Sequence, residues 1–323
     1  MLAILLWISL FIIGYIIIFF AADVFLDNLK ELCILYNISP FIIGLIILGI
    51  DPEESIASIF AAINGLTYIA LGNVIGNSII ALTIPFAIPL FYYKVEFNSV
   101  SQYYFNLIYF SLILILAGVY FHFGLLFAGI FCILIYFFYL IRNLRSISRE
   151  DLDRILISED LKQIKLEVQK EEKNSKFKKF ILVFIGLILI FLGGELLIFS
   201  AGNIILLTKI PETFFGFVII AIVTNVEEIT LLLKSIKKKS FEIGLGGMIG
   251  KLIWNLTLTF GVSGVIAMNT SFMWIILWNW FILLFLIIYF NYLSVKKNLG
   301  KTEGLTLLIF FILFISINFV TII

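Results

Sequence analysis

Two pairs of adjacent acidic residues lie inside stretches that are otherwise apolar enough to cross a membrane. The first stretch contains Asp51-Pro52-Glu53-Glu54, and the second contains Thr224-Asn225-Val226-Glu227-Glu228. An ionisable group at bilayer depth costs at least ~2.5–3.5 kcal/mol on insertion scales, so such groups usually face a bundle interior or a wet cavity. Carboxylates and neutral oxygens together are the ligands that hard cations prefer. We therefore interpret both stretches as parts of a functional site.

The composition indicates an integral membrane protein with an all-α fold. Of the 323 residues, 62% are hydrophobic and 13% are charged, and the mean hydropathy is +1.16. A soluble domain averages about 45–50% apolar and about 25% charged residues. We therefore expect a multi-pass protein of the cell membrane, in contact with membrane lipid. Apolar runs predict ten transmembrane helices, near residues 2–21, 39–63, 67–93, 102–120, 123–141, 179–201, 211–234, 242–268, 272–293 and 304–322.

One long polar stretch, residues 142–178, separates a first half (1–141) from a second half (179–323), each with five predicted helices. Acidic and basic residues alternate along it, which indicates a partly helical linker and argues against a nucleic-acid-binding surface. Lysine and arginine concentrate in this linker and in the loops at 234–239 and 296–301, which all fall on one side of a ten-helix protein. The positive-inside rule then predicts a cytoplasmic linker with both termini outside.

The two halves contain an internal repeat. Equivalent residues keep their spacing, as in the pairs Gly14–Asp23 and Gly186–Glu195 (nine residues each) and Glu54–Gly72 and Glu228–Gly246 (18 residues each). Because five is an odd number, the second half is inverted relative to the first, which is typical of secondary transporters. Such proteins bind ions near the midplane, where broken helices meet. Gly49 and Pro52 predict a break in the second helix, whereas a break in the seventh depends on Thr224 and Asn225.

Each half also carries two short motifs. The first half has Gly49-Ile50-Asp51-Pro52-Glu53-Glu54 and then Gly72-Asn73-Val74-Ile75-Gly76-Asn77. The second half has Val223-Thr224-Asn225-Val226-Glu227-Glu228 and then Gly246-Gly247-Met248-Ile249-Gly250-Lys251. Nearly the whole chain, apart from the linker, thereby resembles the cation/calcium antiporters of the sodium/calcium exchanger type. The resemblance implies ten helices, central ion sites, and exchange of calcium for sodium or protons by alternating access. It implies no cofactor besides the transported cations.

The resemblance also implies which residues bind the ions. The family's central glutamates fall on Glu54 and Glu228, while Ile50 and Ala81 stand at two ligand positions without a side-chain oxygen. The other ligand positions that offer oxygen here are Asp51, Thr224, Asn225, Asn77 and Asn255.

Lys251 is the sharpest departure, because it places a cation where the family has a serine. A buried ammonium without a partner is expensive, so we expect Asp51 or one of the glutamates to pair with it. We hypothesise that Lys251 stands in for a bound ion, which would remove one sodium position and change the stoichiometry.

Four further acids each have two interpretations. Glu53 and Glu227 precede the central glutamates, and helix neighbours point about 100° apart. These two acids either line the access path or pair with a cation elsewhere, or they ligate the ion directly at a helix break. Asp23 and Glu195 are equivalent acids of the first and sixth helices. They are either exposed acids at helix ends or carboxylates of the access path.

Together these features predict a secondary active antiporter, not an enzyme, that exchanges calcium or another cation for sodium or protons. The sequence has no Gly-x-x-x-x-Gly-Lys-Ser/Thr phosphate loop, which disfavours an ATP-driven pump. Two alternatives stay open. One is a diverged relative that does not transport and acts as a sensor or scaffold. The other is a cation channel, which the repeat disfavours.

Overall fold

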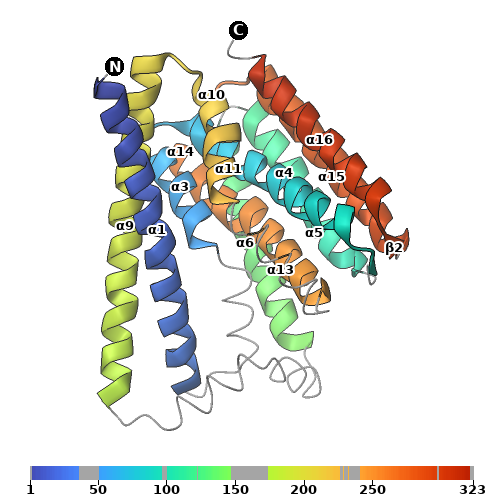
Figure 1. The fold of residues 1–323 in the computed structure, drawn as a ribbon, viewed down its shortest axis with the longest axis horizontal. Helices are drawn as coiled ribbons and strands as arrows, with labels where there is room; N and C mark the ends of the chain where they lie inside the picture. Colours follow the sequence, from blue (N-terminus) through green and yellow to red (C-terminus); the bar gives the residue numbers. More distant parts are fainter. Residues whose placement is uncertain are drawn as a thin grey trace.

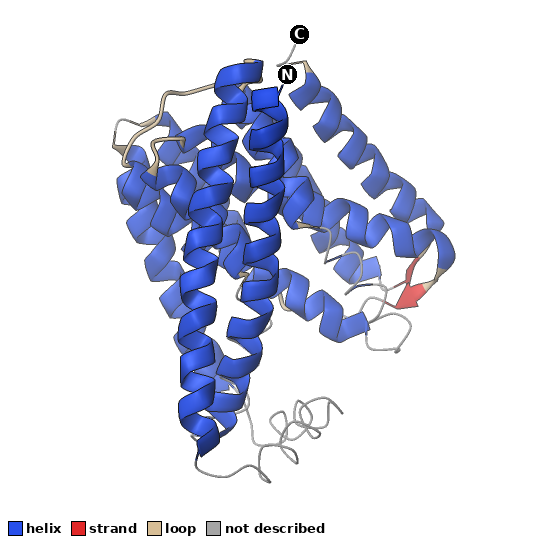
Figure 2. Ribbon diagram, turned by 60° about the vertical axis from the view of Figure 1, so that its left-hand side comes forward, coloured by secondary structure: helices blue, strands red, loops and turns tan. Residues whose placement is uncertain are grey.

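The computed structural model describes residues 2–35, 51–96, 100–121, 123–146, 174–225, 228, 232, 241–296 and 298–320, and most of them are helical (Figures 1 and 2). Eight of the described helices are long and apolar enough to cross a membrane. Six of these are α1 (Leu2–Leu35), α4 (Thr67–Tyr92), α5 (Gln102–Tyr120), α6 (Gly124–Ser146), α15 (Trp274–Lys296) and α16 (Lys301–Phe319). The other two are α9 (Asn174–Thr208) and the continuous segment of α13 (Phe241–Trp254), η2 (Asn255–Thr259) and α14 (Phe260–Ala267).

Two shorter helical segments occupy the positions of the predicted second and seventh helices. One is α3 (Pro52–Ile63), and the other joins α10 (Glu212–Phe214), η1 (Phe215–Ile220) and α11 (Ala221–Thr224). Segments η1 and η2 are π-helical. With these two, helical segments stand at all ten predicted positions, and the predicted all-α membrane fold is confirmed.

Helices α1 and α9 are longer than predicted. Expected near 2–21 and 179–201, they span 34 and 35 residues. Each is therefore about 50 Å long, whereas the hydrocarbon core of a bilayer is about 30 Å thick. They run side by side and antiparallel (Figure 1), as expected for equivalent helices of inverted repeats. A Cβ on Gly14 would lie 2.8 Å from the Leu197 backbone nitrogen, and Lys179 Nζ lies 2.5 Å from Glu31 Oε2 near one end of the pair.

Helix α4 is enclosed by the rest of the bundle and packs closely against η1. A Cβ on Gly72 would lie 2.8 Å from the backbone nitrogen of Phe217, and a Cβ on Gly216 would lie 2.7 Å from the Cα of Ile69. Small residues permit such backbone approach between membrane helices. The contact brings the third and seventh helices together, one from each half.

The two halves also meet outside the helices. Strand β1 (Val95–Glu96) pairs antiparallel with β2 (Asn298–Leu299), which joins the loop after α4 to the loop between α15 and α16. The two chain termini lie at the same end of the molecule (Figures 1 and 2), as an even number of crossings requires.

Candidate functional site

The first half contributes a helix N-terminus to the site. Helix α3 begins at Pro52, and the Asp51 side chain caps it by accepting a hydrogen bond from the Glu54 backbone nitrogen at 3.1 Å. Proline suits the first helical position because its missing N–H would have no partner there, and the helix dipole favours acids in the first turn. The described helix thus begins where Pro52 predicts a break; Gly49 and Ile50 lie outside the described residues.

The second half contributes the end of a helix. Helix α11 ends at Thr224, and Asn225 follows with non-helical torsion angles. Both side chains bond back to the preceding turn: Thr224 Oγ1 to the Ile220 carbonyl at 3.1 Å, and Asn225 Nδ2 to the Ala221 carbonyl at 2.8 Å. The helical segment therefore ends at Thr224 and Asn225, the two residues that the sequence indicated as the possible break in the seventh helix.

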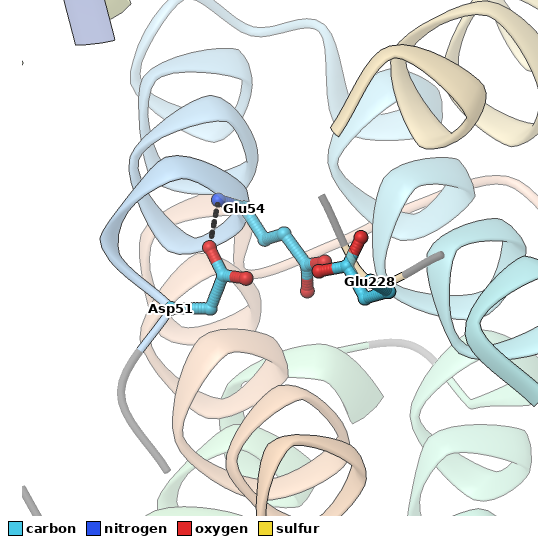
Figure 3. Close-up of side chains that lie close together, drawn as sticks. All are labelled: Asp51, Glu54 and Glu228. Carbon is cyan, nitrogen blue, oxygen red and sulfur yellow. Dashed lines mark hydrogen bonds between the residues drawn. The ribbon is translucent and has the colours of Figure 1, made fainter. Parts of the chain in front are cut away.

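Four charged side chains meet between these two helix ends, and we call Asp51, Glu54, Glu228 and Lys251 the charge cluster. The three carboxyl groups converge (Figure 3), with one oxygen of each within 4.8 Å of the others. Lys251 Nζ lies 2.7 Å from Asp51 Oδ2 and 2.6 Å from Glu54 Oε1, and it also contacts Glu228 Oε1. Lys251 therefore pairs with all three acids, whereas the sequence predicted that one of them would pair with it.

The charge cluster is almost closed to solvent. The Glu54 side chain is fully buried, those of Glu228 and Lys251 are 6% and 10% exposed, and that of Asp51 is 19% exposed. Buried charges are tolerated when they are paired and hydrogen-bonded. Three carboxylates and one ammonium give a formal charge of −2, which leaves the charge cluster with an unmatched attraction for cations.

Buried asparagine side chains link the helical segments that pack against α3. Asn77 Nδ2 donates to Thr224 Oγ1 at 2.9 Å, which links α4 to α11. Asn255 Nδ2 donates to the Val74 carbonyl at 3.0 Å and to Ser78 Oγ at 3.2 Å, which links η2 to α4. These bonds hold Asn77, Thr224 and Asn255 as buried side chains of α4 and of two segments that contact it.

Several buried oxygens of this region have no hydrogen-bond partner among the described residues. They are Glu54 Oε2, Glu228 Oε2 and the Oδ1 atoms of Asn73, Asn77, Asn225 and Asn255. The Nδ2 atom of each asparagine donates to an oxygen, which fixes which end of the amide is the acceptor. Because a buried acceptor without a donor is costly, and because cations bind such oxygens, this arrangement fits a cation site.

Sequence reasoning missed four residues that position the charge cluster. Asn73 Nδ2 donates to the Glu54 carbonyl at 3.0 Å. Ser55 Oγ lies 2.7 Å from Thr259 Oγ1 and accepts a hydrogen bond from Trp254 Nε1 at 2.7 Å. Only their positions in the sequence could have identified these residues. Ser55 follows Glu54, and Trp254 lies three residues after Lys251, on the same side of a helix.

The other predicted acids lie apart from the charge cluster or outside the described residues. Glu53 is buried in the first turn of α3, but it is not in the group of converging acids. Glu227 is outside the described part of the chain. Asp23 and Glu195 are exposed. The interpretation of these two as helix-end acids is wrong, because α1 continues for 12 residues past Asp23 and α9 for 13 past Glu195.

The sequence matches a family model and known membrane proteins. The family model described as "Sodium/calcium exchanger protein" matches residues 6–145 and 178–320. An uncharacterized membrane protein of Methanocaldococcus jannaschii is 24% identical over 267 residues, which cover 81% of each protein.

Two solved structures share the fold. A structure of the sodium-calcium exchanger NCX_Mj soaked with Na⁺ and Sr²⁺ has a TM-score of 0.58 at 18% identity, covering 97% of this chain and 99% of that one. The H⁺/Ca²⁺ exchanger CAX has a TM-score of 0.73 at 11% identity, covering 98% of this chain and 84% of that one. The matched ranges span both halves and leave out only the linker and the extreme ends. The chain is a multi-pass membrane protein that belongs to the sodium/calcium exchanger protein family.

Proposed function

We propose that this protein is a secondary active antiporter that exchanges calcium or another cation for sodium or protons. The cations would bind near the midplane at Glu54 and Glu228, with Asp51, Thr224, Asn225, Asn77 and Asn255 as further oxygen ligands. An ion gradient would drive the exchange by alternating access between the two inverted halves. This transport activity needs no catalytic residue and no cofactor.

One observation carries the proposal most directly. Two acids from opposite halves, Glu54 and Glu228, converge between a helix start and a helix end, and each keeps a buried oxygen that receives no hydrogen bond from the described residues. An acid kept only for structure would be expected to have its oxygens satisfied by protein donors. Discontinuous helices that meet at a charged site are the usual ion-binding arrangement of secondary transporters.

The proposed organisation follows from the same architecture. Residues 1–141 and 179–323 would form the two repeats, joined by a cytoplasmic linker at 142–178. Both termini would face the outside of the cell membrane. Glu53, Glu227, Asp23 and Glu195 would line the access path. Exposed acids along α1 and α9 suit this role, because a carboxylate facing the path would attract a cation before it reaches the charge cluster.

A second candidate function is supported by Lys251. The Lys251 ammonium contacts all three acids and permanently neutralises part of the site. A relative that has lost transport would also be expected to contain such an ammonium. Such a protein would serve as a sensor or scaffold. Within the described part of the chain, Glu54 Oε2 and Glu228 Oε2 receive no hydrogen bond, and these atoms favour the antiporter because they can still bind a further cation.

Flux into proteoliposomes tests the proposal. We expect saturable Ca²⁺ uptake that requires an outward gradient of Na⁺ or protons and that is lost in Glu54→Gln and Glu228→Gln. The matched control is Glu31→Gln, which removes an acid that pairs with Lys179 near the end of α1. Uptake without saturation would support a channel, and no flux under any gradient would support the non-transporting relative.

A further inference from the structure

The ammonium of Lys251 acts as a cation that is already in the site. A lysine ammonium has three N–H donors. Three carboxylate oxygens surround it, one each from Asp51, Glu54 and Glu228. The number of donors therefore equals the number of carboxylates, and this buried ammonium needs no further partner to be satisfied.

The ammonium does not use up the oxygens of the site. Glu54 and Glu228 each retain a buried Oε2 atom without a hydrogen-bond partner in the described part of the chain. The amide oxygens of Asn77, Asn225 and Asn255 are in the same state. Asn255 follows Lys251 by four residues in the continuous α13–η2 segment, and Asn77 follows Asn73, whose Nδ2 donates to the Glu54 carbonyl, by four residues in α4. These amides therefore lie on helical turns next to the charge cluster. The region thus offers carboxylate and amide oxygens to an ion besides Lys251.

Charge sets how many ions fit. The three acids carry −3 and Lys251 carries +1, which leaves −2, and the asparagines and Thr224 add no charge. One divalent cation or two monovalent cations bring the charge cluster to zero. Three monovalent cations would leave a net positive charge in a buried site, which is unfavourable, and Lys251 already takes the place of one of them.

We propose that each transport cycle exchanges one divalent cation for two monovalent cations and moves no net charge across the membrane. This proposal deepens the proposed function and rests on it. The tethered ammonium travels with the protein and returns with it, so it contributes equally to both half-cycles. The loaded site is neutral in both, which makes the exchange insensitive to the membrane potential.

Equilibrium Ca²⁺ accumulation at a fixed Na⁺ gradient tests this stoichiometry. The wild-type protein is reconstituted into liposomes whose potential is set with K⁺ and valinomycin at zero and at roughly 100 mV of either sign. A cycle that moves one net charge would shift the Ca²⁺ accumulation ratio about 50-fold per 100 mV. We expect no shift, and an accumulation ratio that follows the square of the Na⁺ ratio. A parallel arm replaces the Na⁺ gradient by a pH gradient, which distinguishes sodium from protons as the monovalent partner.

The outcomes separate the two proposals. Gradient-dependent Ca²⁺ uptake that changes with potential overturns the electroneutral stoichiometry and leaves the antiporter intact. No gradient-dependent uptake at any potential overturns the proposed function and this inference together. Lys251→Met adds a second measurement, because removal of the ammonium makes room for a third monovalent cation and is expected to make exchange voltage-dependent. Lys94→Met, at an exposed lysine between α4 and β1, is expected to leave exchange electroneutral.

Discussion

Removal of the Lys251 ammonium should destabilise the protein in the absence of cations. Lys251→Met keeps a side chain of similar length but leaves Asp51, Glu54 and Glu228 facing one another without a counter-charge, so the formal charge of the charge cluster changes from −2 to −3. Breaking a single buried ion pair by removing one partner costs about 3–5 kcal/mol. Here one substitution removes three contacts, so we expect a loss in the free energy of unfolding at least in that range.

The assay is unfolding in mixed detergent micelles with a chelator, followed by addition of Ca²⁺. Ligand at about 100 times its Kd stabilises the folded state by about 2.7 kcal/mol. The cation should therefore recover much of the loss, because it replaces the missing ammonium. A double variant with the wild-type net charge, Asp51→Asn with Lys251→Met, restores −2 and should recover part of the stability without added cation, because one of the three repelling carboxylates is removed. Lys94→Met is the control for loss of an exposed lysine.

Two results would refute this reasoning. If Lys251→Met unfolds like the wild type in chelator, the three acids are not held together by the ammonium. If the loss is as large in the double variant as in the single one, the cause is lost packing and not uncompensated charge.

Two further predictions concern the elements that hold the site. Gly76→Ala should lower both stability and Ca²⁺ uptake, because its Cβ would lie 2.8 Å from the Cα of Phe217 and would push α4 away from η1. Gly202→Ala should be neutral in the same unfolding and uptake assays, because the nearest described atom to its Cβ would be a Leu66 methyl group at an ordinary contact distance of 3.6 Å. Ser55→Ala should lower the free energy of unfolding by about 1–3 kcal/mol, because the indole N–H of Trp254 loses its acceptor; Ser9→Ala, at an exposed serine, should change it little, and equal losses would contradict the role of Ser55.

Much of the fold was predictable because the bilayer imposes simple rules on sequence. Apolar runs placed helical segments correctly, and the repeat spacing indicated the inverted arrangement that α1 and α9 display. The ends of α1 and α9 were not predictable from hydropathy, because charged and polar residues interrupt their outer turns and contacts between the two helices, such as Lys179 with Glu31, hold them.

The site was predictable where one half repeats the other. Glu54 and Glu228 stood out as repeat partners, and Lys251 stood out as a departure from a motif. Contacts between the two halves leave no comparable pattern in the sequence. The hydrogen bond from Trp254 to Ser55 joins residues 199 positions apart, and the π-helical turns of η1 and η2 lie where the halves pack together. Such features depend on tertiary packing, which local sequence does not encode.

The central claim is that a transported cation binds between Glu54 and Glu228 while Lys251 stays in the site. The most direct test is an experimental structure of crystals soaked in Sr²⁺, with the ion located by its anomalous scattering. We predict one peak within about 2.3–2.8 Å of oxygens from both glutamates, with Lys251 Nζ still in contact with Asp51. The absence of a peak there in protein that transports the ion, or a Lys251 side chain displaced from the acids, would contradict the claim.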